Sequence, residues 1–184
     1  MKKTLLIAAM AFMTVSVFGQ SFGRVNTTEL VQLSPEADEA RAKLQTQGQD
    51  AQQTYQDMVD EFNKKYEAYQ KGVSGFSEAV RATKEKELNE INQRVQEFSA
   101  NVQQELAQSE QALFQPIYQK ATGIVKDLAK KYGLTLVFEE GSFPYYDEAA
   151  IKDLTPEARK SMGIQEGRTL ESLQAEMQAQ QQGK

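Results

Sequence analysis

Apolar residues return every three or four positions from Ser34 to about Leu113, and this run is interrupted once, at Gly72 to Gly75. Such spacing places the apolar side chains on one face of a helix, as in a coiled coil. Up to and across the break this face comprises Leu44, Gly48, Ala51, Tyr55, Met58, Phe62, Tyr66, Tyr69, Val73 and Phe76. After the break it comprises Val80, Leu88, Ile91, Val95, Phe98, Val102, Leu106, Ser109 and Leu113. The pattern predicts two long helices.

The two helices should fold back on each other as an antiparallel hairpin, the arm, over residues 34–115 with its tip near 72–75. Ser34, Pro35 and Glu36 form a strong helix start, and the glycines of the tip end the first helix. At 1.5 Å per residue, each helix is roughly 55 Å long. Two helices alone cannot enclose a sizeable core, so the arm must project from a body.

The body is expected to come from residues 20–33 and 116–163, on either side of the arm. Residues 22–27 form a candidate strand with Phe22 and Arg24 on one face and Gly23 and Val25 on the other. Beyond the arm, Pro116 is expected to kink a helix that ends at Lys131 to Gly133, where cations and a glycine suit the C-terminus.

The remaining elements of the body are short. Residues 134–138 predict a strand with Leu134, Leu136 and Phe138 on one face, and residues 144–146 a possible edge strand. A short helix begins at Leu154 and closes at Gly163. The fold class is therefore α+β, a small β body carrying a helical coiled-coil arm, and so small a sheet favours self-association.

The two ends of the chain differ from the rest. Lys2, Lys3 and about 15 apolar residues, fewer than the roughly 20 that span a bilayer, predict a cleaved secretory signal peptide over residues 1–19 rather than a membrane anchor. The tail, residues 164–184, has apolar residues at helical spacing but ends in glutamines, so it is expected to be a frayed helix or disordered. Export with cleavage implies a periplasmic location and no stable membrane insertion.

The charge of the chain argues against nucleic-acid binding. The sequence carries 21 basic and 26 acidic residues, a net of −5, and loss of Lys2 and Lys3 makes it about −7. Residues 64–94 around the tip are nevertheless mildly basic, whereas residues 35–63 are strongly acidic. Lys71 and Lys84 at the tip are therefore candidate contacts for a binding partner.

Enzymatic chemistry is not expected. Histidine and cysteine are both absent, which removes the imidazole base, the thiolate nucleophile and the usual zinc and iron ligands. Glu85, Glu87 and Glu90 lie among cations at helical spacing and are expected to form surface ion pairs. A metal-binding turn at residues 139–141 is the remaining alternative, and no cofactor is predicted.

Aromatic residues on the arm suggest a binding role. Tyr55, Phe62, Tyr66, Tyr69 and Phe76 fall mainly on the apolar face, so ordinary packing is one interpretation. A two-helix arm, however, leaves one flank of such rings exposed, and exposed apolar strips suit weak contact with apolar chain segments. Gly48, Ala51 and Ser109 are small residues of the same face and should loosen the packing.

The order of elements resembles the Skp (OmpH-like) family of periplasmic chaperones. The likeness covers about residues 22–163 and rests on the strand at 22–27, the helix start at 34–36, the stretch 116–138 and the helix start at 153–155. It implies a homotrimer in which Phe22, Val25, Leu134, Leu136 and Phe138 build a central body. It also implies that three arms enclose a cavity that holds unfolded outer-membrane β-barrel proteins without ATP. The family's arms are strongly basic, whereas this chain is acidic apart from its tip.

Three functions follow from these observations. The first is an ATP-independent holdase chaperone whose partners are unfolded outer-membrane β-barrel proteins and further copies of the chain. The second is a coiled-coil structural or adaptor protein of the cell envelope, which should have a well-filled interface between its helices. The third is an enzyme or metal carrier, which the missing histidine and cysteine oppose.

Overall fold

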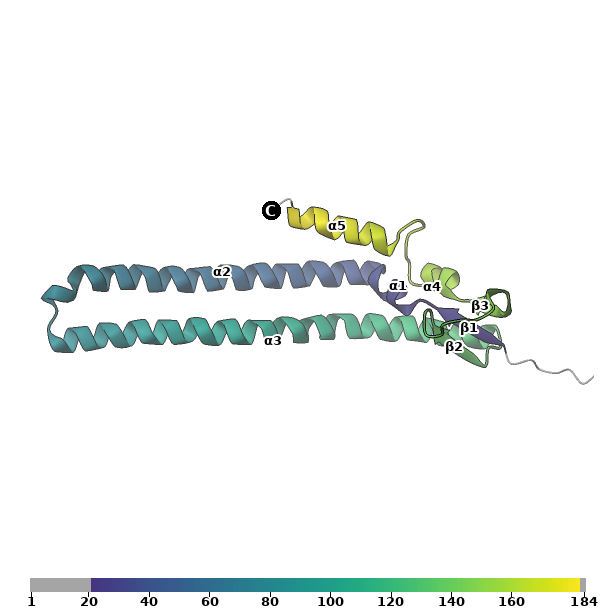
Figure 1. The fold of residues 1–184 in the computed structure, drawn as a ribbon, viewed down its shortest axis with the longest axis horizontal. Coiled ribbons are helices and arrows are strands. Elements are labelled where there is room, and N and C mark those ends of the chain that lie inside the picture. The colour runs from purple at the N-terminus through teal and green to yellow at the C-terminus, as the bar shows by residue number, and fades with distance from the viewer. Residues whose placement is uncertain (1–20, 183–184) are drawn as a thin grey trace, which may run out of the picture.

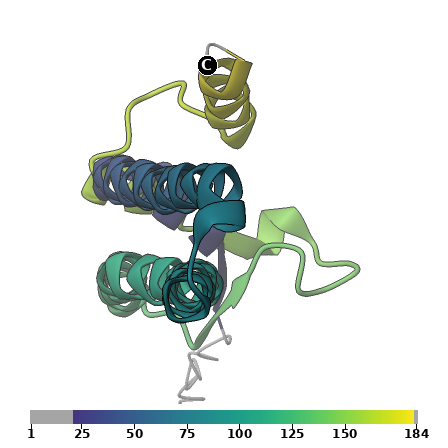
Figure 2. The ribbon, with the colours of Figure 1, turned by 90° about the vertical axis from the view of Figure 1, so that its left-hand side faces the viewer.

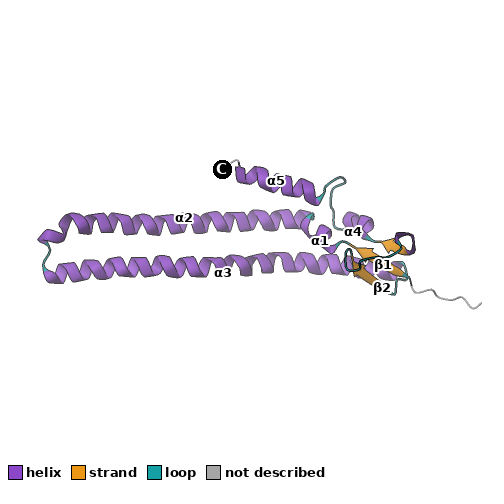
Figure 3. Cartoon of the chain, viewed as in Figure 1, coloured by secondary structure: helices purple, strands orange, loops and turns teal. Residues whose placement is uncertain are grey.

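The computed structural model describes residues 21–182, so the predicted signal peptide lies outside the described part of the chain. Figure 1 shows two long helices lying side by side, with a small sheet at one end and a separate helix near the C-terminus. Helices dominate and strands occur only in the body, as Figure 3 shows. Among residues 21–182, no helix is both long enough and apolar enough to cross a membrane.

The arm consists of helix α2 (Pro35–Gly72), a 3-10 turn (Val73–Gly75) and helix α3 (Glu78–Lys131). The Ser34 hydroxyl accepts a hydrogen bond from the Ala37 amide at 3.2 Å, and Pro35 occupies the first turn. Ser77 caps α3 in the same way by accepting from the Val80 amide at 3.3 Å. The predicted hairpin and its tip at 72–75 are confirmed.

Helix α3 continues from the arm into the body. It runs for 54 residues with Pro116 inside it, so the predicted boundary at residue 115 falls within one helix. The expected C-terminus is confirmed, because Lys130 and Lys131 lie in the last turn and Gly133 has a φ of 62°. A single helix thus belongs to both parts of the protein.

Three short parallel strands form the sheet, in the order β2-β1-β3. They are β1 (Phe22–Val25), β2 (Leu136–Glu139) and β3 (Ile151–Asp153), and a 3-10 turn (Glu148–Ala150) precedes the last. The edge strand expected at residues 144–146 is wrong, since these residues form a loop. Their aromatic character serves packing instead: the rings of Phe143 and Tyr146 meet that of Phe138 edge-on, at centroid distances of 4.9 and 5.3 Å.

The two faces of the sheet differ from the prediction at one position. Leu136 and Phe138 align with Phe22 and Arg24 of β1, so these four residues share a face. Leu134 precedes β2 and packs on the other side, where its Cδ1 atom would lie 2.6 Å from a Cβ added to Gly23. The expectation that Leu134 shares a face with Leu136 and Phe138 is therefore wrong, because the strand starts two residues later than predicted.

The hydrophobic core lies where the arm joins the body. Helices α1 (Thr27–Gln32) and α4 (Thr155–Ser161) and the final turns of α3 cover one face of the sheet. The largest fully buried apolar side chains of this core are Leu30, Leu33, Leu154 and Met162. The expected short helix with its close at Gly163 is confirmed, since Gly163 has a φ of 75°. Within residues 21–182, no helix packs against the opposite face of the sheet.

The tail forms a helix, α5 (Leu170–Gln182), which agrees with the first of the two alternatives. In the end-on view of Figure 2, α5 lies on the far side of α2 from α3. Leu173 is buried with 7% of its surface exposed and belongs to the main core. The tail is thus attached to the root of the arm.

Candidate functional site

Five aromatic side chains, here called the aromatic strip, follow one another along the outer half of the arm. They are Tyr55, Phe62, Tyr66, Tyr69 and Phe76. Their spacing brings rings of the same helix together: Phe62 and Tyr66 stack at 5.9 Å between centroids with planes 9° apart. Tyr69 meets Phe76, which lies beyond the tip, at 6.1 Å. The structure therefore brings four of the five rings together in two pairs.

The aromatic strip is only partly covered by α3. Tyr55 and Tyr66 are exposed over 37% and 44% of their surface, and Phe62, Tyr69 and Phe76 are half-buried. In this outer half of the arm, Ile91 of α3 is the one buried side chain of the described residues, at 2%. Packing and exposure thus coexist in the same rings, because a hairpin gives each helix a partner on one side only.

Polar contacts tie α2 to α3 alongside the aromatic strip. The Tyr69 hydroxyl donates to Glu85 Oε1 at 2.6 Å, and this bond raises the pKa of Tyr69. Lys65 forms an ion pair with Glu87, and Arg94 lies 3.4 Å from Glu61. The hydrogen bond from Lys65 lowers the pKa of Glu87 and raises that of Lys65 itself. The outer arm is held as a pair of helices by side chains of opposite charge.

The two tip cations that were candidate contacts already have acidic neighbours. Lys71 lies 3.8 Å from Glu67 on α2, and Lys84 lies 3.5 Å from Glu87 on α3. The predicted surface ion pairs of Glu87 and Glu90 are present, the latter with Lys86 at 3.7 Å. That Glu85 and Glu87 also reach across to α2 was missed, because helical spacing reports only neighbours on the same helix. Both candidate cations thus already have an acidic neighbour on their own helix.

A gap, here called the mid-arm hollow, opens between α2 and α3 nearer the body. It has a volume of about 300 Å³ and is lined by Gln47, Asp50, Ala51, Thr54, Phe98, Val102, Glu105, Leu106 and Ser109. Ser109 donates to Gln47 Oε1 at 2.7 Å across it, and a Cβ added to Gly48 would meet nothing within 4 Å. The loosened packing predicted from Gly48, Ala51 and Ser109 is present. The apolar lining from Phe98, Val102 and Leu106 was not singled out from sequence.

The five residues predicted for the body divide between two faces of the sheet. Val25 is buried in the core, and Leu134 packs against it. Phe22, Leu136 and Phe138 lie on the face without a helix, where Leu136 is 50% exposed. In the loop after β2, Phe143 packs against Phe138, and Tyr145 is 84% exposed. Sequence reasoning missed this loop because its aromatic run was interpreted as a strand.

The acidic turn at residues 139–141 is engaged in structural contacts. Glu139 Oε1 accepts a hydrogen bond from the Thr27 amide at 2.8 Å, at the start of α1. Glu140 pairs with Arg24 and accepts from the Asn26 side chain at 3.1 Å. Within residues 21–182, no three acidic side chains come close enough together to hold a metal ion. The turn therefore offers a cap and an ion pair instead of a ligand set.

The arm, the parallel sheet and α4 correspond as a unit to a known family. The family model of the outer membrane protein (OmpH-like) family matches residues 21–162. The chain belongs to this family. This OmpH-like chain is 27% identical over 164 residues to an uncharacterised protein of Aquifex aeolicus (strain VF5), covering 88% of this chain and 96% of the relative.

A solved structure shows the same fold at low sequence identity. It is a protein of Caulobacter crescentus CB15 assigned as an outer membrane chaperone (OmpH-like). The two structures superpose with a TM-score of 0.69 at 13% identity, over 77% of this chain and 83% of the other. The family match ends at residue 162, so α5 of this OmpH-like chain lies beyond it.

Proposed function

We propose that this protein is an ATP-independent holdase chaperone of the periplasm that binds unfolded outer-membrane β-barrel proteins and prevents their aggregation. The observation that carries this proposal is the aromatic strip, in which Tyr55 and Tyr66 remain 37% and 44% exposed on a projecting arm. The proposal is also supported by the chain's membership of the OmpH-like family and by the Caulobacter crescentus outer membrane chaperone (OmpH-like), which has the same fold.

The chemistry of the arm suits an unfolded chain better than a folded partner. Half-covered rings provide apolar contact without demanding one geometry, and the mid-arm hollow of about 300 Å³ has room for an apolar side chain of the client. Lys71 and Lys84 are already close to Glu67 and Glu87, so we expect apolar contact to contribute more than charge to the binding of a client. No glycine-rich phosphate loop occurs in the sequence, consistent with holding that needs no nucleotide.

We further propose a homotrimer whose arms surround the client. The supporting feature is the face of the sheet without a helix, where Phe22, Leu136 and Phe138 lie together and Leu136 is 50% exposed. Phe143, whose ring meets that of Phe138 at 4.9 Å and which is 49% exposed, extends this apolar surface. Parallel sheets are almost always covered on both faces, so burial against two further copies would complete this one.

The remaining aspects of the proposal follow from charge and export. A predicted signal peptide over residues 1–19 directs the chain to the periplasm without stable membrane insertion. The net charge of the mature chain, about −7, opposes nucleic-acid binding. No cofactor is required.

The test is to dilute a urea-unfolded outer-membrane β-barrel protein into buffer with and without this protein and to follow light scattering at low and high salt. Suppression at both salt concentrations is expected, because apolar contact survives screening whereas exposed charge pairs do not. Suppression at low salt alone would assign the binding to Lys71, Lys84 and the other tip cations. Scattering that is unchanged at every ratio would overturn the holdase and favour the coiled-coil adaptor.

A further inference from the structure

Helix α5 lies against the root of the arm and outside the part of the chain that the family model matches. It follows the linker of residues 162–169 out of α4 and then runs along α2 on the side opposite α3 (Figures 1 and 2). Gly167 in this linker has a φ of 78°, which turns the chain so that Arg168 meets α2. The body and the arm are already connected where α2 begins and where α3 runs from one into the other. The contact of α5 with α2 is a third connection.

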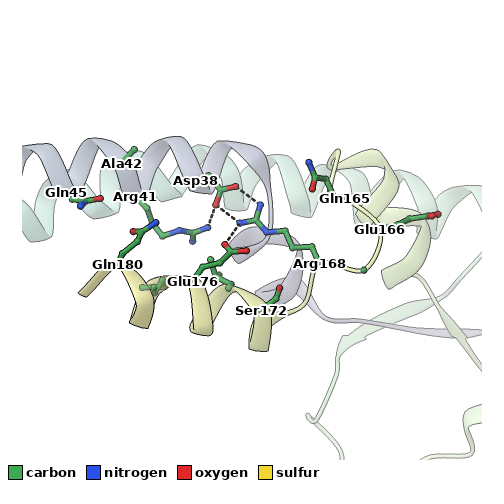
Figure 4. A pocket seen from close by; sticks show the side chains of 13 residues that line it. Asp38, Arg41, Ala42, Gln45, Gln165, Glu166, Arg168, Ser172, Glu176 and Gln180 are labelled. Carbon is green, nitrogen blue, oxygen red and sulfur yellow. Dashed lines mark hydrogen bonds and ion pairs between the residues drawn. The ribbon is translucent and has the colours of Figure 1, made fainter. Parts of the chain in front are cut away.

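A charged anchor holds the start of α5 to α2. Arg168 donates through Nη1 and Nη2 to the two carboxylate oxygens of Asp38, at 2.5 and 2.7 Å (Figure 4). The Arg168 side chain is only 16% exposed, and these bonds lower the pKa of Asp38. A two-pronged contact between guanidinium and carboxylate is directional as well as strong. It fixes where α5 begins.

The same anchor belongs to a chain of contacts between the body and the arm. Arg41 also donates to Asp38, at 2.7 Å, and to the Gln32 carbonyl at the end of α1, at 2.8 Å. The Arg168 carbonyl accepts a hydrogen bond from Arg159 of α4 at 2.6 Å. Arg159 in turn pairs with Glu29 of α1. The first turns of α2 are thus linked to α1 and α4 through Arg41 and Arg168.

Apolar contact between α5 and α2 is confined to a short stretch. Leu173 is buried in the main core at 7% exposure, whereas Leu170 and Met177, on the same side of α5, remain 38% and 43% exposed. Between the two helices lies a hollow of about 580 Å³, which Arg41, Ala42 and Gln45 line from α2. Among the residues that the structure describes, α5 is therefore held by the Arg168–Asp38 ion pair and by Leu173, its one buried side chain, so its attachment is small beside the rest of the core.

We propose that α5 is a clasp that fixes the angle between the arm and the body, and that raised salt opens it. The direction of α2 is set by contacts at its first turns, since it starts directly after the turn at Leu33 and Ser34. Asp38 is one of these contacts and is held from the body through Arg168. With Arg168 released, α2 keeps its packing on α3 but loses one of its ties to the body, so the arm swings more freely. The Asp38 side chain is 43% exposed, so dissolved ions reach the anchor.

The test uses intrachain distances and amide exchange in the whole protein. The sequence has no cysteine, so a pair of introduced cysteines at exposed positions, Gln52 on the arm and Glu148 in the body, carries spin labels specifically. The labelled chain is diluted with unlabelled chain so that only intrachain distances are read by electron paramagnetic resonance. Hydrogen exchange of residues 170–182 reports the attachment of α5 in parallel.

The expected result is the same for two independent variants. Arg168→Ala and Asp38→Asn should each raise the exchange rate of α5 at least tenfold and broaden the distance distribution between Gln52 and Glu148. The double variant should add less than twofold, because both changes break one contact. Raising the salt concentration should likewise increase the exchange rate of α5 and broaden the distance distribution in the unchanged protein. Arg168→Lys should give values between those of the unchanged protein and Arg168→Ala. Lys126→Ala, which removes an exposed cation from α3, is the matched control.

Two results would overturn the proposal, and neither depends on client binding. If α5 retains its protection in Arg168→Ala, the anchor does not hold it. If α5 is released and the distance between Gln52 and Glu148 keeps its narrow distribution, α5 does not set the direction of the arm. Circular dichroism of each variant verifies that the long helices remain folded, so that a change of distance is not mistaken for unfolding.

Discussion

The ring of Phe76 lies on Gly72 at the tip of the arm. A Cβ added to Gly72 would stand 2.6 Å from Phe76 Cε1, closer than carbon atoms approach. Gly72 has an ordinary φ of −104°, so its role is to make room for the ring rather than to adopt a backbone shape closed to other residues. An aromatic side chain is thus packed directly on the bare backbone of the tip.

Replacement of Gly72 by alanine should displace this ring. We expect Gly72→Ala to break the contact between Phe76 and Tyr69 and to cost about 1 kcal/mol at the tip, by overpacking. Hydrogen exchange of residues 70–80 measures the loss. Gly75→Ala is the matched control, because a Cβ there meets nothing within 4 Å. Equal exchange in the two variants would show that Phe76 does not rest on Gly72 in solution.

The opposite change is expected at Gly48, which lies within α2 beside the mid-arm hollow. Because a Cβ there meets nothing within 4 Å, Gly48→Ala should stabilise the protein by about 0.5–1 kcal/mol through helix propensity. Urea unfolding followed by circular dichroism measures this as a higher midpoint with an unchanged slope. A lower midpoint would mean that the open space at Gly48 is filled in solution.

The aromatic strip should carry most of the proposed binding of clients. We expect Phe62→Ser, Tyr66→Ser and Tyr69→Ser together to raise the protein concentration needed for half suppression of scattering about tenfold, equivalent to about 1.4 kcal/mol. Tyr118→Ser removes a tyrosine that is 57% exposed on α3 but lies outside the strip, and it should leave suppression unchanged. Equal suppression by the triple variant and the control would exclude an apolar grip by the strip.

The hydrogen bond between Tyr69 and Glu85 predicts a pH dependence on the alkaline side. Because the Tyr69 hydroxyl donates to a carboxylate, its pKa is raised from the ordinary value of 10.0. A raised pKa stabilises the fold fully below pH 10, and that stabilisation is lost as the pH rises through the higher value. Titration of tyrosinate absorbance should show a late component that Glu85→Gln shifts to lower pH. A titration identical in both proteins would contradict the bond.

Assembly can be tested through the face of the sheet without a helix. Leu136→Asp places a charge at the centre of the proposed contact between copies, so we expect it to convert a trimer into monomers. Sedimentation equilibrium at micromolar concentration measures the mass. Val80→Asp is the control, since Val80 is similarly exposed at 43% but lies near the tip. A monomeric mass for the unchanged protein would contradict the proposed trimer.

The arm could be predicted from sequence because its signals are local. Ser34 and Pro35 start a helix, Gly133 ends one, and apolar spacing between them identifies the face that packs. The small size of Gly48, Ala51 and Ser109 on the apolar face likewise predicted loose packing between the two helices. Each of these features depends on residues within one or two turns, which is the range over which sequence patterns report.

The features that were missed depend on residues far apart in the chain. Tyr69 and Glu85 lie on different helices, and Arg168 reaches Asp38 from the other end of the protein. The third strand was misplaced because an aromatic run suits both a strand and a packed loop, and only the position of Phe138 decides between them. For the same reason the face of Leu134 could not be assigned before the first residue of β2 was known.

The central position of β1 determines the order in which the protein can fold. Its neighbours β2 and β3 both come after the arm in sequence, so β1 is synthesised long before either neighbour. The hairpin, in contrast, can zip from its tip through contacts of growing sequence separation, and this brings the two ends of the sheet together at little further loop-closure cost. The sheet is therefore expected to form after the arm, and a chain that ends before Leu136 would hold both arm helices without β2 and β3.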